Sequence, residues 1–171
     1  MNDIPPIESG DEKEVYAFFG LAAYMAQVLE RSAINFALIL QLPEVDLVTR
    51  ELYESSYETL ERKTFGKLLR ACEKEFELPN HAKEIMDDAL KTRNHLIHSY
   101  FYEKSEDLIS EKGRIEMMEE LQGIIGKFQI ADKLLESIYL PIYDNYGVSK
   151  EYLASEYEAR LQRARDRDGA A

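Results

Sequence analysis

Apolar residues recur at intervals of three and four along most of this chain, which is the spacing of one face of an amphipathic helix. The first such pattern runs from Asp11 to Gln41 without an internal proline and predicts a long bundle helix. We expect Pro43 to end this helix, with a connector over residues 42–47. The apolar positions of the pattern are Val15, Phe18, Phe19, Ala22, Met25, Ala26, Leu29, Ala33, Phe36, Ala37 and Leu40.

Three further helices are expected in the middle of the chain. Residues 48–60 carry a weaker periodic pattern, which predicts a short helix. Residues 61–76 carry a clearer one, in which Gly66 predicts a close approach to a neighbouring helix. Asn80 then follows a turn and is a candidate N-cap for a helix that should run to about Glu103.

The last third of the chain predicts one long helix and one shorter helix. Gly113 marks a break, after which the apolar pattern resumes at Arg114 and should stop at Pro141. Ser149 is a candidate N-cap for a last helix over about residues 150–165. Several arginines crowd the end of that helix, a pattern compatible either with a solvated helix end or with a phosphate-binding tail. They are Arg160, Arg163, Arg165 and Arg167.

The chain lacks the alternating pattern of strands and the short turn sequences of β-hairpins. The expected fold class is therefore all-α, an up-and-down bundle of four main helices with short accessory helices. We divide it into a flexible N-terminal arm over residues 1–10, a helical bundle over residues 11–147, and a C-terminal accessory helix and tail over residues 148–171. Its length suits a single hydrophobic core.

One charged residue conflicts with this packing pattern. With 100° of rotation per residue, the apolar positions between residues 82 and 101 fall within roughly 80° of Arg93. An arginine thus occupies the centre of an apolar stripe, and Asn94 and His98 lie along one border of it. An unpaired guanidinium is very unfavourable to bury, so Arg93 needs an acidic partner, a wet cleft or a ligand. Such a conflict between local chemistry and packing is typical of a functional site.

The net charge limits the possible partners. The formal charge is −12 at pH 7, which disfavours constitutive electrostatic binding of nucleic acid because such affinity comes mainly from many contacts between basic residues and phosphates, and no DNA partner is expected. The segment 80–104 is an exception, since its charges balance and it holds all three histidines. Of these, His81 has no evident role, and His95 projects away from the stripe and should be solvated.

Other features favour a cytoplasmic protein without a metal or cofactor. The single cysteine, Cys72, excludes an internal disulfide and lies on the apolar face of its helix, where a buried thiol is expected. No apolar run is long enough to span a membrane, and the N-terminus lacks the features of a signal peptide. The paired carboxylates lack a histidine at metal-binding spacing, and no nucleotide-binding glycine motif is present.

The sequence Arg93-Asn94, three residues, His98, one residue and Tyr100 resembles the signature of the HEPN superfamily. Those proteins carry an arginine, a polar residue and a histidine on a late helix of an all-α bundle. The spacing here, followed by a tyrosine, is similar to that of HEPN toxins paired with minimal nucleotidyltransferase antitoxins. The match covers about eight residues, which is short for a motif.

The resemblance implies a homodimer in which two motif helices face each other across a cleft, with metal-independent endoribonuclease chemistry on RNA. Arg93 would stabilise the negative charge on the scissile phosphate, and His98 would act as general base or acid. Asn94 would orient the phosphate or the histidine. Tyr100 would be a possible modification site, where a nucleotidyltransferase-type antitoxin attaches AMP. The chain would then be the toxin-like component of a toxin–antitoxin or defence module.

Two alternatives remain open from the sequence. The rival to the nuclease is a catalytically inactive HEPN-like dimer that acts as a protein-interaction or nucleotide-binding module. It is also compatible with a plain helical scaffold, in which Arg93 pairs with an acid on the first long helix and Tyr100 belongs to the core. The exposure of Arg93 and His98 should separate these interpretations.

Overall fold

The fold is all-α, as the periodicity predicts. The structure is a computed structural model that describes residues 3–169, and no strand occurs among them. The first long helix, α1 (Glu12–Gln41), carries a cap at Asp11, whose side chain accepts a hydrogen bond from the Lys13 N–H. A short 3₁₀ turn, η1 (Val45–Leu47), follows it.

Two shorter helices come next, where the sequence predicts helices over residues 48–60 and 61–76. They are α2 (Arg50–Glu61) and α3 (Phe65–Glu75). A Cβ atom at Gly66 would lie 3.3 Å from Leu90 on the following helix, so the expected close approach at this glycine is confirmed.

The helix expected over residues 80–103 is divided in two. It forms α4 (Asn80–His98) and the single turn α5 (Tyr100–Glu103), separated at Ser99. The backbone of Ser99 departs from helical geometry, with φ −129° and ψ −24°. Asn80 is the first helical residue and not the N-cap, because Pro79 occupies the cap position without a side-chain hydrogen bond.

The second long helix is longer at both ends than the sequence predicts. A 3₁₀ turn, η2 (Asp107–Ile109), leads into α6 (Glu111–Asp144), and Ser110 caps it by accepting a hydrogen bond from Gly113 N–H. Gly113 therefore lies inside the first turn and does not break the helix. Pro141 does not stop the helix either, since one proline removes a single N–H near its end. The last helix, α7 (Lys150–Gly169), begins at the expected Ser149 cap and extends past Arg165.

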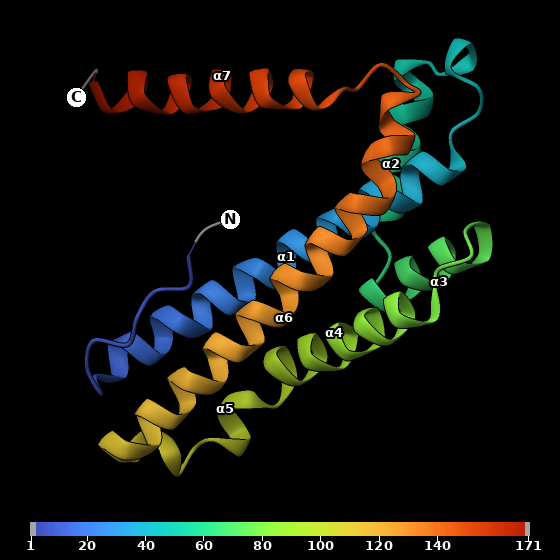
Figure 1. Cartoon of the computed structure of the whole chain (residues 1–171). Coiled ribbons are helices and arrows are strands. Elements are labelled where there is room, and N and C mark those ends of the chain that lie inside the picture. The colour runs from blue at the N-terminus through green and yellow to red at the C-terminus, as the bar shows by residue number, and fades with distance from the viewer. Residues whose placement is uncertain (1–2, 170–171) are drawn as a thin grey trace.

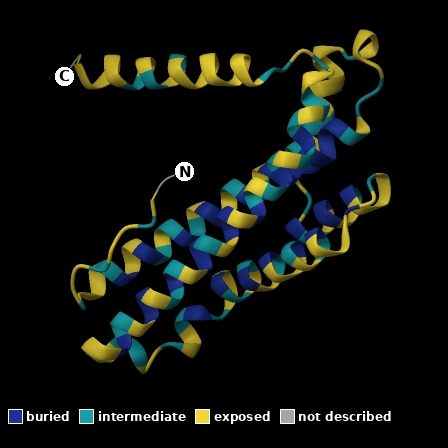
Figure 2. Cartoon of the chain, viewed as in Figure 1, coloured by how far each residue is buried: buried dark blue, intermediate teal, exposed yellow. Residues whose placement is uncertain are grey.

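The core lies between α1 and α6 on one side and α3 and α4 on the other (Figure 1). The two long helices run in the same direction, so that Gly10 lies beside Arg114 at one end and Pro43 beside Tyr146 at the other. Helix α4 runs in the opposite direction and contacts both of them. Most buried apolar residues come from α1 and α6, whereas α2 contributes only Leu60. Burial is concentrated along the facing sides of these helices (Figure 2).

The N-terminal arm has no regular structure over residues 3–10, as expected, but it is attached to the bundle. Arg114 donates from Nε to the carbonyl of Gly10 at 2.5 Å, and Gln122 donates to the carbonyl of Pro5 at 2.8 Å. Ile4 and Ile7 pack against the core. These contacts join residues 3–10 to the bundle, while residues 1 and 2 lie outside the described part of the chain.

Candidate functional site

The candidate site is a strip on the C-terminal half of α4, called here the motif face. It consists of Arg93, Asn94, Ile97 and His98, which occupy positions i, i+1, i+4 and i+5 of one helix. Residues four apart are neighbours on a helix surface, so Arg93 lies next to Ile97 and Asn94 lies next to His98. The helix thus places the arginine at one edge of the strip and the histidine at the other.

Arg93 has the acidic partner that its position demands. Its Nε lies 2.5 Å from Oε1 of Glu30 on α1. The two side chains are 26% and 27% exposed, so the pair is neither sealed in the core nor free in solvent. A charge at this depth needs compensation, and the carboxylate of Glu30 supplies it. An acidic partner on the first long helix is what the sequence predicts for a plain helical scaffold.

The pairing leaves part of the guanidinium available. Glu30 engages Nε, while Nη1 donates a long hydrogen bond of 3.3 Å to Oδ1 of Asn94. The planar fork of an arginine carries five N–H donors, and its terminal nitrogens suit an anion approaching from the surface. Asn94 thus helps Glu30 to orient the guanidinium of Arg93. The spacing of the two residues in the sequence does not establish this role.

The other members of the motif face are open to solvent. His98 and Asn94 are exposed, and Ile97 is 44% exposed. The sequence places Ile97 in the apolar stripe, which the structure contradicts. The buried face of α4 is centred on Ala89 and Leu96, so Ile97 falls beyond its edge.

Aromatic residues of α5 and α1 form a second, partly exposed apolar cluster. The ring of Phe101 lies 4.7 Å from that of Phe19 and 5.5 Å from that of Tyr16, measured between centroids. Tyr16 remains 47% exposed. Exposed apolar groups beside charged and polar ones are typical of surfaces that bind another protein.

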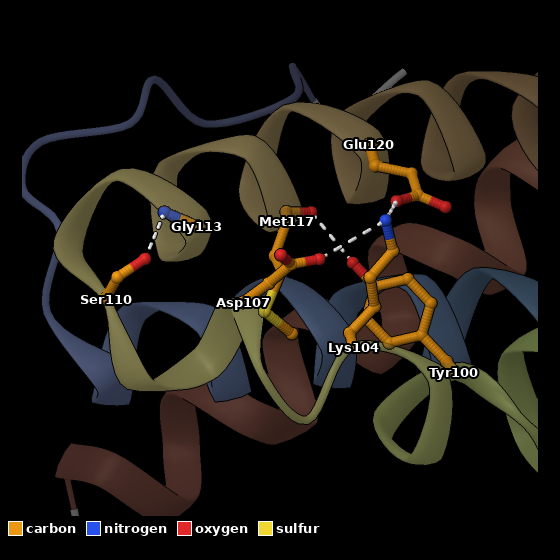
Figure 3. Close-up of polar contacts among 7 residues, drawn as sticks. All are labelled: Tyr100, Lys104, Asp107, Ser110, Gly113, Met117 and Glu120. Carbon is orange, nitrogen blue, oxygen red and sulfur yellow. Dashed lines mark hydrogen bonds and ion pairs between the residues drawn. The ribbon is translucent and has the colours of Figure 1, made fainter.

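Tyr100 is a core residue and is not displayed on the motif face. It is 1% exposed, and its hydroxyl donates a hydrogen bond of 2.9 Å to the carbonyl of Met117 on α6 (Figure 3). Burial raises the pKa of this phenol, with smaller contributions from nearby acids. The break at Ser99 directs the ring inwards, so an enzyme that modifies the hydroxyl would first have to unpack it.

The turn after the motif helix is held by a small polar network (Figure 3). Nζ of Lys104 lies 2.8 Å from Glu120 and 3.6 Å from Asp107. The hydrogen bond to Glu120 raises the pKa of Lys104. The N-terminal cap of α6 at Ser110 closes the same corner. This network fixes the path from α4 into α6 and thereby the direction in which Tyr100 enters the core.

His95 lies in a groove that the sequence pattern does not reveal. Its side chain is 34% exposed, and its Nδ1 lies 3.7 Å from Glu103. The groove, of about 490 Å³, runs between α4 and α6. Lys91, His95 and Lys127 lie along it, with Glu120. His95 was expected to be solvated because a single apolar stripe does not reveal that α4 packs against α1 on one flank and against α6 on the other.

Within residues 3–169, no group of three or more histidine, cysteine or acidic side chains is placed to hold a metal ion. The same part of the chain contains no helix of the length and apolar character needed to cross a bilayer. Cys72 is buried, and its thiol lies 3.8 Å from the carbonyl of Ala33.

In comparisons with known proteins, no protein-family model, curated protein or solved structure matches this chain. The function proposed below therefore rests on the residues of the motif face and on the resemblance of their sequence.

Proposed function

We propose that this protein is a HEPN-type, metal-independent endoribonuclease, with a HEPN-like bundle as its scaffold and a toxin-like role in a toxin–antitoxin or defence module. The observation that supports it is the state of Arg93. Its Nε is held by Glu30, and its side chain, 26% exposed, lies on the same strip as the exposed His98. A plain ion pair would not require a histidine on that strip.

The chemistry assigns one role to each residue. Cleavage of RNA through attack by the ribose 2′-hydroxyl needs proton transfer near neutral pH, which His98 supplies as general base or acid. It also needs a fixed positive charge at the phosphorane oxygens, which Arg93 supplies through its terminal nitrogens. Asn94 orients the guanidinium through the hydrogen bond from Nη1.

The proposed enzyme acts as a homodimer. Arg93 and His98 are five residues apart, and on one helix their side chains diverge by about 140°. One copy alone does not direct both groups at one phosphate, whereas two facing motif helices supply two such pairs across a cleft. The exposed Ile97 on the motif face and the exposed Tyr16 on α1 provide apolar surface for that contact.

A second candidate function is favoured by the same ion pair. Because Glu30 already compensates the charge of Arg93 within one chain, the arginine needs no substrate phosphate. The rival is therefore a catalytically inactive HEPN-like dimer that binds a protein or a nucleotide on the motif face. A nucleotidyltransferase-type partner fits either function, but it would not find the hydroxyl of Tyr100 accessible in this fold.

The deciding experiment is cleavage of fluorogenic RNA in the presence of EDTA. We expect His98→Gln to lower the rate by about 10²- to 10⁴-fold, the usual contribution of a general acid or base. Arg93→Gln should abolish cleavage as well. His95→Gln is the matched control, since it changes the same residue type on another side of the same helix, and it should retain activity.

Sedimentation equilibrium on the same proteins tests the dimer. A folded, dimeric wild type that cleaves no RNA would favour the inactive module. Cleavage that persists in both His98→Gln and Arg93→Gln would place the activity at another site and refute the proposal.

A further inference from the structure

Helix α7 stands apart from the bundle. It contains no buried residue and projects away from the top of α6 as a straight rod (Figures 1 and 2). A helix of 20 residues is about 30 Å long. Its residues are not needed for the core, so their side chains are free to serve a binding role.

The outer half of α7 carries a basic face. Arg160, Arg163 and Arg167 lie within about 60° of one another around the helix axis. They line a shallow hollow together with Asp166. Within the described residues 3–169, none of these arginines forms an ion pair, and the carboxylate of the neighbouring Asp166 accepts a hydrogen bond from Gln162 at 2.7 Å. Three unpaired arginines thus gather on one face of a chain whose net charge is −12.

The helix dipole does not account for this face. The dipole favours cations only in the last turn of a helix, and Arg167 is the only basic residue there. Arg163 lies about one turn earlier and Arg160 about two turns earlier. The choice of arginine is also informative, since its planar fork binds phosphate oxygens in pairs and lysine does not.

Exposed tyrosines border the same face. Tyr157 is 61% exposed and Tyr152 is 53% exposed. Arginines for phosphates beside aromatic rings for stacking are the combination that binds single-stranded nucleic acid without sequence preference. Arg165, by contrast, lies on the opposite side of the helix, and we assign it no part in the face.

We propose that α7 is an RNA-binding arm, in which Arg160, Arg163 and Arg167 bind backbone phosphates of single-stranded RNA and Tyr157 stacks on a base. The identity of the ligand as RNA rests on the proposed nuclease function. The arm holds one segment of the substrate while another segment occupies the motif face. This division explains how a strongly acidic protein retains an RNA that its other surfaces repel.

Binding is measured by fluorescence anisotropy with a labelled single-stranded RNA, in the His98→Ala background to prevent cleavage. The variant replaces Arg160, Arg163 and Arg167 together with glutamine. We expect its Kd to rise about tenfold or more at physiological salt. The slope of log K against log salt should fall by about 2, since each phosphate contact on a single strand contributes about 0.7. Tyr157→Ala should weaken binding by roughly fivefold or more.

The matched control removes the same charge elsewhere. Arg62, Lys67 and Arg70 are exposed on α3 and the turn before it, and they are replaced together with glutamine. Circular dichroism should show that both triple variants keep their helix content. If the control weakens binding as much as the α7 variant, the effect is general electrostatics and the arm is refuted.

Other results separate the arm from the nuclease. Arginine-dependent RNA binding without cleavage by the wild type would support the arm and overturn the nuclease. Cleavage that is unchanged in KM by the three arginine replacements would support the nuclease and overturn the arm. Absence of RNA binding, or binding to anionic lipid vesicles in its place, would also overturn the arm.

Discussion

Removing the charge of Glu30 should destabilise the protein by about 1–2 kcal/mol. Breaking a fully buried ion pair by removing one partner costs about 3–5 kcal/mol, and breaking an exposed one costs about 0–1 kcal/mol. The Arg93–Glu30 pair is 26% and 27% exposed and lies between these limits. Glu30→Gln keeps an acceptor for the Nε hydrogen bond and removes only the charge, which places the expected loss in the lower half of the range.

Urea unfolding of four proteins measures the interaction free energy between Arg93 and Glu30. They are the wild type, Glu30→Gln, Arg93→Gln and the double variant. The double variant should lose less than the sum of the two single losses, with a coupling energy of about 1 kcal/mol. That coupling should persist in 0.5 M salt, because a pair that is mostly buried is only weakly screened.

The matched control for this cycle is the exposed pair between Arg50 and Glu54, with side chains 85% and 56% exposed. Glu54→Gln should change the free energy of unfolding by less than about 0.5 kcal/mol. If Glu30→Gln changes the free energy of unfolding as little as Glu54→Gln does and shows no coupling with Arg93, then Glu30 does not hold the arginine.

Four further outcomes follow from the packing and the titration of single residues. Gly113→Ala should destabilise by about 1–3 kcal/mol, because its Cβ would collide with the backbone of the preceding turn. Gly123→Ala has no atom within 4 Å of the new Cβ and should stabilise by about 0.5–1 kcal/mol, so thermal unfolding of the two variants should shift in opposite directions. The thiol of Cys72, whose pKa burial raises to about 12, should react with a thiol reagent at pH 8 only after unfolding. Burial, aided by Asp132, raises the pKa of Glu136, so stability should fall as pH rises through the window between its unfolded and folded pKa. Glu136→Gln should therefore raise the Tm at pH 7 and leave it unchanged below that window, and an equal rise at both pH values would contradict the raised pKa.

The long helices could be predicted from the sequence because each of them buries one continuous apolar stripe over many turns. The ends of α1 at Asp11 and Gln41 follow from capping and from Pro43, which are local signals. The predicted ends of α6 are wrong because Gly113 and Pro141 do not break the helix. Both residues are compatible with the first or last turn of a helix. Whether they interrupt it depends on tertiary contacts.

The candidate site could be predicted only in part, because the apolar pattern describes one helix and not its neighbours. The periodic pattern shows that Arg93 needs a partner, but it does not name Glu30, which is 63 residues away along the chain. The inward turn of Tyr100 depends on a one-residue break at Ser99, which carries no strong sequence signal. The groove beside His95 exists only because a second helix packs there.

The parallel arrangement of α1 and α6 has a consequence for the order of assembly. Ser32 on α1 bonds Asp132 on α6 across 100 residues of chain, so their shared core closes only after everything between them has been made. Contacts that distant in sequence slow the search for the native state. During synthesis the apolar side of α1 that faces α6 stays uncovered, because only α2, α3 and α4 are present to contact α1 until α6 has left the ribosome. Chaperone dependence of a newly made chain should accordingly diminish once α6 has emerged.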